Sequence, residues 1–207
     1  MFDIYVGDYP VYFVFVNILL GLTPFFLGYL LIKLYKSNYK FKSFLQFITF
    51  FVWLIFSPNA PYMIVDIRHI NGFCEVSQTN ICTNNAWHII FFFIFGLLGW
   101  VFYFYMIDQI RVYLSKVLSK NFAKLFPVII TPIISLGLLI GLTERLNTWD
   151  VIFNFTNVVD AIFSYLMLAE NQHNLIAFTI GLYFLYYLAK ILFIPINKLK
   201  LAKKWIT

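Results

Sequence analysis

The sequence predicts an all-α fold: a polytopic membrane helix bundle with five transmembrane helices and one further helix at the membrane surface. Of its 207 residues, 62% are hydrophobic, 22% are aromatic and only 12% are charged, a balance outside the range of soluble domains. Five apolar stretches approach or reach the roughly 20 residues that cross a hydrocarbon core. They form a single predicted membrane-embedded domain, residues 1–207, and cover residues 9–32, 44–65, 87–107, 125–142 and 175–194.

The first stretch is predicted to be a retained helix and not a cleaved signal peptide. A signal peptide begins with basic residues, whereas the opening segment MFDIYVGDYP contains two aspartates and neither Lys nor Arg. Within the stretch, Pro24 lies between Gly21 and Gly28. This combination predicts a kink and close contact with a neighbouring helix.

The distribution of basic residues predicts the orientation of the bundle. Short cytoplasmic loops are enriched in Lys and Arg, and all 15 basic residues except Arg68 and Arg145 fall on one predicted side. That side is assigned to the cytoplasm, so the amino terminus is expected outside and the carboxyl terminus inside. The lysine fringe is expected to meet anionic lipid headgroups, which explains the net charge of +6 without a nucleic-acid partner.

A further apolar segment, residues 151–168, is predicted to be an interfacial or re-entrant helix on the outer side. As a sixth span it would place Lys190 and the lysine-rich tail outside, against the bias of the other loops. Its apolar and polar residues recur on two different helical faces. The apolar stripe contains Val151, Phe155, Val158, Val159, Ile162, Phe163 and Leu166, and the polar face contains Asn154, Asn157, Asp160 and Ser164.

The second apolar stretch ends in SPNAPYMIVDIRH, residues 57–69, which we call the first polar cluster. Pro58 and Pro61 each remove a backbone donor. Asn59 is expected either to donate its amide to a freed carbonyl or to present that amide to a ligand. Pro61 suits the first position of a new helical turn.

If a helix resumes at Pro61, three polar side chains share one face. Tyr62, Asp66 and His69 follow each other at spacings of four and three residues. The sequence therefore predicts a phenol, a carboxylate and an imidazole in one row near the outer end of this helix.

The segment TERLNTWDV, residues 143–151, forms a second polar cluster at the end of the fourth stretch. Trp149 suits the headgroup level, where aromatic rings anchor helices. Both clusters fall on the predicted outer side, so we expect them to meet. The polar and aromatic members of the second cluster are Glu144, Arg145, Asn147, Trp149 and Asp150.

The two clusters resemble the bacterial integral-membrane family catalogued as domain of unknown function 1361. That family carries a Pro-Asn-x-Pro-Tyr motif running into Asp-x-x-His, and a later Arg-x-Asn-Ser-Trp-Asp motif, similar to FSPNAPYMIVDIRHI and RLNTWDV here. Thr148 replaces the serine, Leu142 replaces an arginine, and Trp87 and His88 replace an aromatic-acidic pair. The resemblance implies a bacterial plasma-membrane protein and brings no activity. It maps the family pattern onto Pro58, Asn59, Pro61, Tyr62, Asp66, His69, Arg145, Asn147, Trp149 and Asp150.

The chemistry of these side chains suggests roles for them. Asp66, His69 and Asp150 are the candidate catalytic residues, because carboxylates and imidazoles exchange protons. Zinc accepts the same ligands, so Asp66 and His69 are the candidate metal ligands, although the sequence lacks a paired-ligand motif such as HExxH. The candidate substrate-binding residues are Asn59, Tyr62, Arg145, Asn147 and Trp149.

A structural alternative remains open for the same residues. Asp66 would then pair with Arg68 or Arg145, and the clusters would close the end of the bundle. Separately, Cys74 and Cys82 flank a polar loop on the predicted oxidising side, where a disulfide is possible.

Three classes of function are compatible with the sequence. The first is an enzyme or binding protein for a lipid-linked or anionic extracytoplasmic substrate, with Arg145 holding the anionic group. The second is a structural or accessory membrane subunit, whose protein partner the sequence does not identify. The third is a small-solute transport component, which the sequence favours less because the middle of the spans offers little polar chemistry beyond Asn17.

Overall fold

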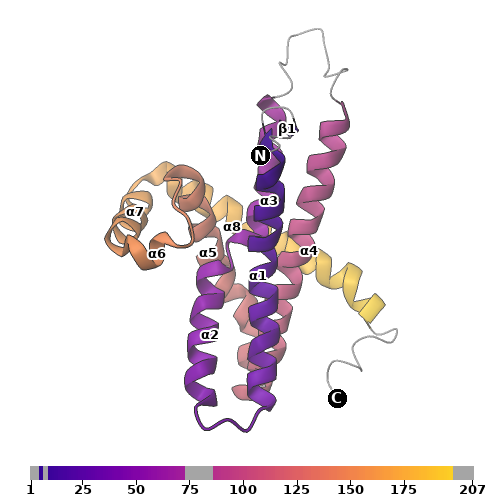
Figure 1. Ribbon diagram of the computed structural model, residues 1–207, viewed down its shortest axis with the longest axis vertical. Coiled ribbons are helices and arrows are strands. Elements are labelled where there is room, and N and C mark those ends of the chain that lie inside the picture. The colour runs from indigo at the N-terminus through magenta and orange to yellow at the C-terminus, as the bar shows by residue number, and fades with distance from the viewer. Residues whose placement is uncertain (1–4, 7–8, 73–85, 198–207) are drawn as a thin grey trace. The chain divides into compact units, whose positions relative to one another are not determined.

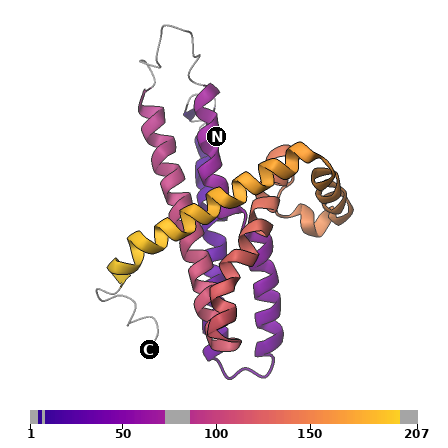
Figure 2. The same cartoon turned by 180° about the vertical axis from the view of Figure 1, so that it is seen from behind.

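The computed structural model describes residues 5–6, 9–72 and 86–197, which are almost entirely helical (Figures 1 and 2). Five helices are long and apolar enough to cross a membrane, which confirms the predicted fold class. Their orientation and the single membrane domain stay predictions. The chain forms two compact units, Met1–Gln109 and Ile110–Thr207. The five spans are Tyr12–Lys36, Lys42–His69, Trp87–Val117, Lys120–Thr143 and Ala169–Phe193.

In the first unit, a short antiparallel hairpin precedes two long helices, α1 and α2, which lie side by side and are joined by a short turn (Figure 1). The second span is assembled from three consecutive pieces, α2, α3 and the 3-10 helix η1. The elements are β1 (Tyr5–Val6), β2 (Tyr9–Pro10), α1 (Val11–Lys36), α2 (Lys42–Phe56), α3 (Asn59–Val65), η1 (Asp66–Gly72) and α4 (Ala86–Val117), whose last turns belong to the second unit.

In the second unit, two spanning helices are joined by two shorter helices, and α8 continues from them as one long helix (Figure 2). Ser119 caps the first of these spans, because its hydroxyl accepts a hydrogen bond from the Phe122 N–H at 3.1 Å. The elements are α5 (Lys120–Thr143), α6 (Asp150–Phe153), α7 (Phe155–Met167) and α8 (Ala169–Asn197).

All five spans extend beyond the predicted apolar stretches at one end or both, and two of them, α4 and α8, do so by the most residues. The third span continues from residue 107 to Val117, and α8 begins at Ala169 instead of residue 175. Charged residues such as Lys116 have good helix propensity. Hydropathy therefore identifies the part of a helix that suits the hydrocarbon core, and the helix itself can continue beyond that part.

Small residues bring α1, α3 and α4 together around Met63. A Cβ atom added at Gly99 would lie 2.7 Å from the Met63 Cβ and 3.0 Å from the Ala60 carbonyl oxygen. A Cβ atom added at Gly21 would lie 2.9 Å from the Met63 Sδ. The two glycines therefore allow α1 and α4 to approach α3, which positions the first polar cluster.

A proline explains a polar contact between α5 and α8. Pro132 has no N–H, so it cannot bond the carbonyl of Val128, four residues earlier. The Tyr183 hydroxyl on α8 donates a hydrogen bond to this carbonyl. Because lipid offers no substitute donor, the tyrosine satisfies a group that the proline leaves open.

Replacing Tyr183 with phenylalanine is expected to lower the free energy of unfolding by about 1 kcal/mol, because the Val128 carbonyl loses its donor in an apolar setting. Reversible unfolding by sodium dodecyl sulfate would measure the change. Tyr187→Phe on the same helix is the control, since its ring is 43% exposed. Equal stability of the two variants would contradict the role of the Tyr183 hydroxyl.

The predicted surface helix is present but differs in two respects. It is divided at Asn154, whose φ of −133° and ψ of 43° separate α6 from α7. The predicted apolar stripe is also divided: Val158 and Ile162 are partly buried beside the buried Tyr165, whereas Phe163 is 60% exposed. One face of α7 thus packs within its own unit, and a second apolar face stays exposed, as suits an interfacial helix.

Candidate functional site

The hydrogen-bond pattern of the second span changes at its two prolines, but the backbone stays helical. Ser57 and Pro58 keep right-handed helical dihedral angles. The Leu54 carbonyl, which would otherwise bond the N–H missing from Pro58, accepts from the Ser57 hydroxyl at 2.8 Å and the Ser57 N–H at 3.3 Å. The Asn59 amide donates to the Phe56 carbonyl at 3.0 Å, so one of its two expected roles is observed.

The helix resumes earlier than predicted. α3 begins at Asn59 and not at Pro61. Pro61 still lies in the first turn of α3, where proline is tolerated. The winding then tightens to a 3-10 helix from Asp66.

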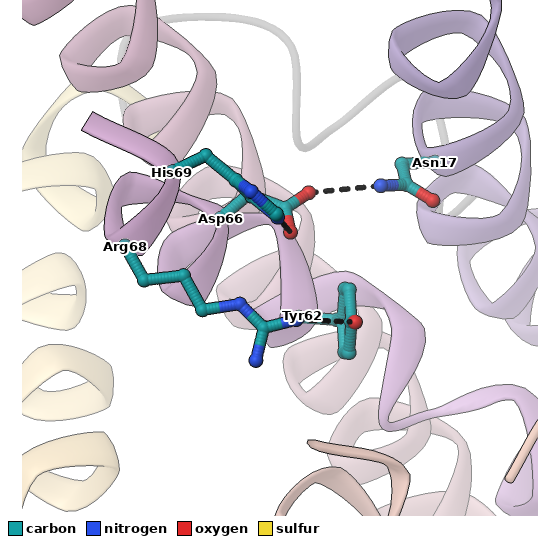
Figure 3. A network of polar contacts seen from close by, with 5 residues as sticks. All are labelled: Asn17, Tyr62, Asp66, Arg68 and His69. Atoms are coloured by element: carbon teal, nitrogen blue, oxygen red, sulfur yellow. Dashed lines mark hydrogen bonds and ion pairs between the residues drawn. The ribbon is translucent and has the colours of Figure 1, made fainter. Parts of the chain in front are cut away.

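Asp66 is the buried centre of the first polar cluster. It is 1% exposed, and its Oδ2 accepts a hydrogen bond of 2.8 Å from the Asn17 Nδ2 on α1 (Figure 3). A carboxylate needs such donors when it leaves water. The contact joins residues 49 positions apart and thereby fixes the end of the second span against α1.

His69 lies beside this carboxylate. Its Nε2 is 3.8 Å from the Asp66 Oδ1, and the imidazole is 37% exposed (Figure 3). Side chains at positions i and i+3 eclipse each other in a 3-10 helix, which explains why these two groups are neighbours. The imidazole also stacks on the buried ring of Phe92 in α4, with ring centroids 6.4 Å apart.

Arg68 turns away from Asp66 and toward Tyr62. Its Nη2 donates to the Tyr62 hydroxyl at 3.2 Å, and the guanidinium lies 6.0 Å from the centroid of the same ring (Figure 3). Among the described contacts, Arg68 is therefore not the partner of Asp66, and the alternative pairing of Asp66 with Arg145 stays a prediction. Of the predicted row of three side chains, Asp66 and His69 lie together, and the Tyr62 hydroxyl accepts from Arg68.

In the second unit, the polar cluster follows the end of α5. Arg145 has a φ of 54°, a left-handed conformation that usually belongs to glycine after a helix. It is exposed, as are Asn147 and Trp149, the latter to 49%. Among the described residues of its own unit, the Arg145 side chain makes no hydrogen bond or ion pair.

Asp150 organises the turn that follows. Its Oδ2 accepts from the Asn147 backbone N–H at 2.7 Å, and its Oδ1 accepts from the Asn154 side chain at 2.7 Å. The Asn147 backbone N–H, followed by the Asn154 amide, holds the pKa of Asp150 below its ordinary value. The ionised carboxylate is thus part of the turn that carries Arg145.

Acidification is expected to loosen this turn. Since the folded pKa of Asp150 is lowered, its stabilising effect is present at neutral pH and is lost as the pH falls through the folded value. A carbon-13 NMR titration of the carboxyl group would follow this. Asn154→Ala should raise the midpoint toward the ordinary value, and an unchanged midpoint would contradict the role of the Asn154 amide.

Two members of the site were not among the predicted site residues. The sequence signal for Asn17 is its isolation as a polar residue in an apolar helix. The sequence indicates Arg68 only as a possible partner of Asp66. The described residues contain no group of three or more His, Cys, Asp or Glu side chains able to hold a metal ion, and Cys74 and Cys82 lie outside the described residues.

The spans and their polar ends define a class: a multi-pass helical membrane protein with charged side chains at the ends of its second and fourth spans. The chain belongs to the family described as "Protein of unknown function (DUF1361)", which it matches over residues 16–189. This match confirms the resemblance carried by the two motifs. No curated protein and no solved structure matches the chain.

Proposed function

We propose that this protein is a membrane-bound enzyme or binding protein for an anionic or lipid-linked substrate, with its site at the outer end of the second span. In this proposal the outer side is extracytoplasmic and the membrane is a bacterial plasma membrane. The observation that supports it is the pairing of a buried carboxylate, Asp66, with a partly exposed imidazole, His69, in the last turn of a span.

The pair suits acid–base chemistry. Ionisable groups at membrane boundaries are costly to bury and usually serve a function. Asp66, held by Asn17, positions the imidazole, and His69 then accepts or donates a proton at the substrate. The separation of 3.8 Å exceeds a hydrogen bond, but catalytic contacts often tighten only when substrate binds.

Aromatic side chains beside His69 suit the lipid part of a substrate. Phe92 and Phe95 are buried, and Phe91 is partly buried and packed against them. Phe91 and Phe95 stack with ring centroids 6.2 Å apart. An acyl or polyprenyl chain that packs against Phe91, the partly exposed member of this group, would place its anionic headgroup at the level of the polar cluster.

A magnetic resonance experiment tests the proposal. The full chain would be labelled with nitrogen-15 histidine in maltoside micelles and titrated with phosphatidic acid, with uncharged diacylglycerol as the comparison and His69→Gln for assignment. We expect the His69 signal to shift with the anionic lipid alone, and Asp66→Asn to change its titration midpoint. The proposal would be ruled out if the His69 signal did not shift with phosphatidic acid and its titration midpoint did not change in Asp66→Asn.

The structural or accessory subunit is the second candidate. The contact between Asn17 and Asp66 favours it, because this contact ties two helices together whatever the substrate. Under this alternative, Asp66→Asn changes only the free energy of unfolding, and the His69 signal does not respond to lipid.

A further inference from the structure

We propose that Arg68 and Arg145 each bind a phosphate group at the membrane surface. This inference rests on the proposed function, because it names the anionic group that the substrate would carry. It adds Arg68, which was not among the predicted binding residues, and it assigns both arginines the same chemistry.

The first observation is that both residues are arginines and not lysines. Only three of the 15 basic residues are arginines, Arg68, Arg111 and Arg145, and the other basic residues are lysines. The two Lys or Arg residues on the predicted outer side, Arg68 and Arg145, are both arginines. The planar guanidinium matches phosphate with two parallel hydrogen bonds, whereas lysine offers a point charge.

The neighbouring carboxylates do not neutralise these guanidinium groups. In the first unit, Asp66 is held by Asn17 and lies beside His69, while Arg68 bonds the neutral Tyr62 hydroxyl. The Tyr62 contact uses one N–H of a group that has five. Arg68 is exposed, so its remaining donors are available to a ligand.

The second unit repeats this separation. Asp150 accepts from Asn147 and Asn154, and within the described part of this unit neither Asp150 nor the adjacent Glu144 forms an ion pair with Arg145. Arg145 also keeps a left-handed backbone, at φ 54°, where glycine would be relaxed. Such a conformation at a side-chain-bearing residue points to function.

The level of both residues in the membrane indicates phosphate. Arg68 immediately precedes the end of the second span at His69, and Arg145 lies two residues beyond the end of α5 at Thr143. Lipid phosphates lie at the same boundary between hydrocarbon and water. A lipid headgroup and soluble phosphate offer the same chemistry, so the experiment must separate the two sources.

The test measures binding to the full chain in dodecyl maltoside, a detergent without phosphate. The probes are short-chain phosphatidic acid and inorganic phosphate. Arg68→Gln and Arg145→Gln are compared with Lys40→Gln and Lys120→Gln, which remove exposed charges from the same two units. We expect each arginine variant to weaken phosphatidic acid binding about tenfold or more, with partial recovery in Arg68→Lys and Arg145→Lys. The lysine controls should lose much less affinity, because they contribute only a point charge to anionic headgroups.

The outcomes separate the alternatives. Binding of phosphatidic acid alone assigns a lipid headgroup, and binding of both probes assigns phosphate from either source. If the arginine variants bind as tightly as the unchanged chain, or the lysine controls lose as much affinity, the inference is overturned. The variants should unfold at the same temperature as the unchanged chain, and Arg145→Gly, which relaxes the backbone, should lose binding without losing stability.

Failure of this inference differs from failure of the proposed function. Should the arginines bind phosphate while the His69 signal never responds to lipid, the acid–base site is ruled out and the phosphate sites stand. Should His69 respond while the arginine variants bind normally, the site stands and this inference is wrong.

Discussion

Replacing Gly99 with alanine is expected to lower the free energy of unfolding by about 2 to 3 kcal/mol, within the range for overpacking a tight core. The new methyl group would lie 2.7 Å from the Met63 Cβ, 3.0 Å from the Ala60 carbonyl oxygen and 3.2 Å from the Ile64 nitrogen. Two of these atoms belong to the backbone of α3, so they cannot yield by a side-chain rotation. Either α3 or α4 must move.

Gly181→Ala on α8 is the matched control for this substitution. No atom lies within 4 Å of a Cβ added there, so the only effect is the better helix propensity of alanine, and stability should stay equal or rise by up to about 1 kcal/mol. Unfolding by sodium dodecyl sulfate would compare the two. If both variants were equally stable, the close approach of α3 and α4 would be refuted.

The consequence of Gly99→Ala should reach the polar cluster. Phe92, on which His69 stacks, lies on the same helix as Gly99. Moving α4 away from α3 would therefore separate the imidazole from its aromatic support. A changed chemical shift of His69 in Gly99→Ala, but not in Gly181→Ala, would show that the packing of α4 on α3 positions the imidazole.

The spans were predictable from sequence because the membrane imposes a simple requirement. About 20 apolar residues must follow one another to cross the core, and this pattern is visible without any knowledge of packing. The ends were less predictable. The turns of α4 before Val117 contain Asp108, Arg111 and Lys116. Charged residues are compatible with a helix that continues beyond the hydrocarbon core, so hydropathy does not reveal where the helix ends.

The candidate site was predictable only where its members are close in sequence. Asp66 and His69 lie three residues apart, so either an α-helix or a 3-10 helix brings them together. Arg68 reaches Tyr62 across six positions because the winding changes between α3 and η1, and this change has no clear sequence signal. The partner of Asp66 on α1 depends on the rotation of one helix against another, which hydropathy does not define.

Replacing Asn17 with leucine is expected to lower the free energy of unfolding by about 3 kcal/mol. The leucine fills a similar volume but removes the amide that donates to Asp66 at 2.8 Å. A buried carboxylate that loses its donor is more costly than a lost neutral hydrogen bond. Detergent unfolding would measure the loss, and Asn17→Asp, which places a second carboxylate there, should be at least as destabilising at neutral pH.

A double-mutant cycle decides whether this loss belongs to the contact itself. Asp66→Leu alone leaves the Asn17 amide without its acceptor, so we expect a loss of about 1 to 3 kcal/mol. In the double variant, Asn17→Leu with Asp66→Leu, no charge is buried, and the total loss should be smaller than the sum of the single losses by about 1 to 2 kcal/mol. Strict additivity would mean that the two side chains stabilise the protein independently. The double variant should also be tested for the response of His69 to anionic lipid. If it recovers part of the lost stability but shows no response, the buried charge serves the site and not the fold.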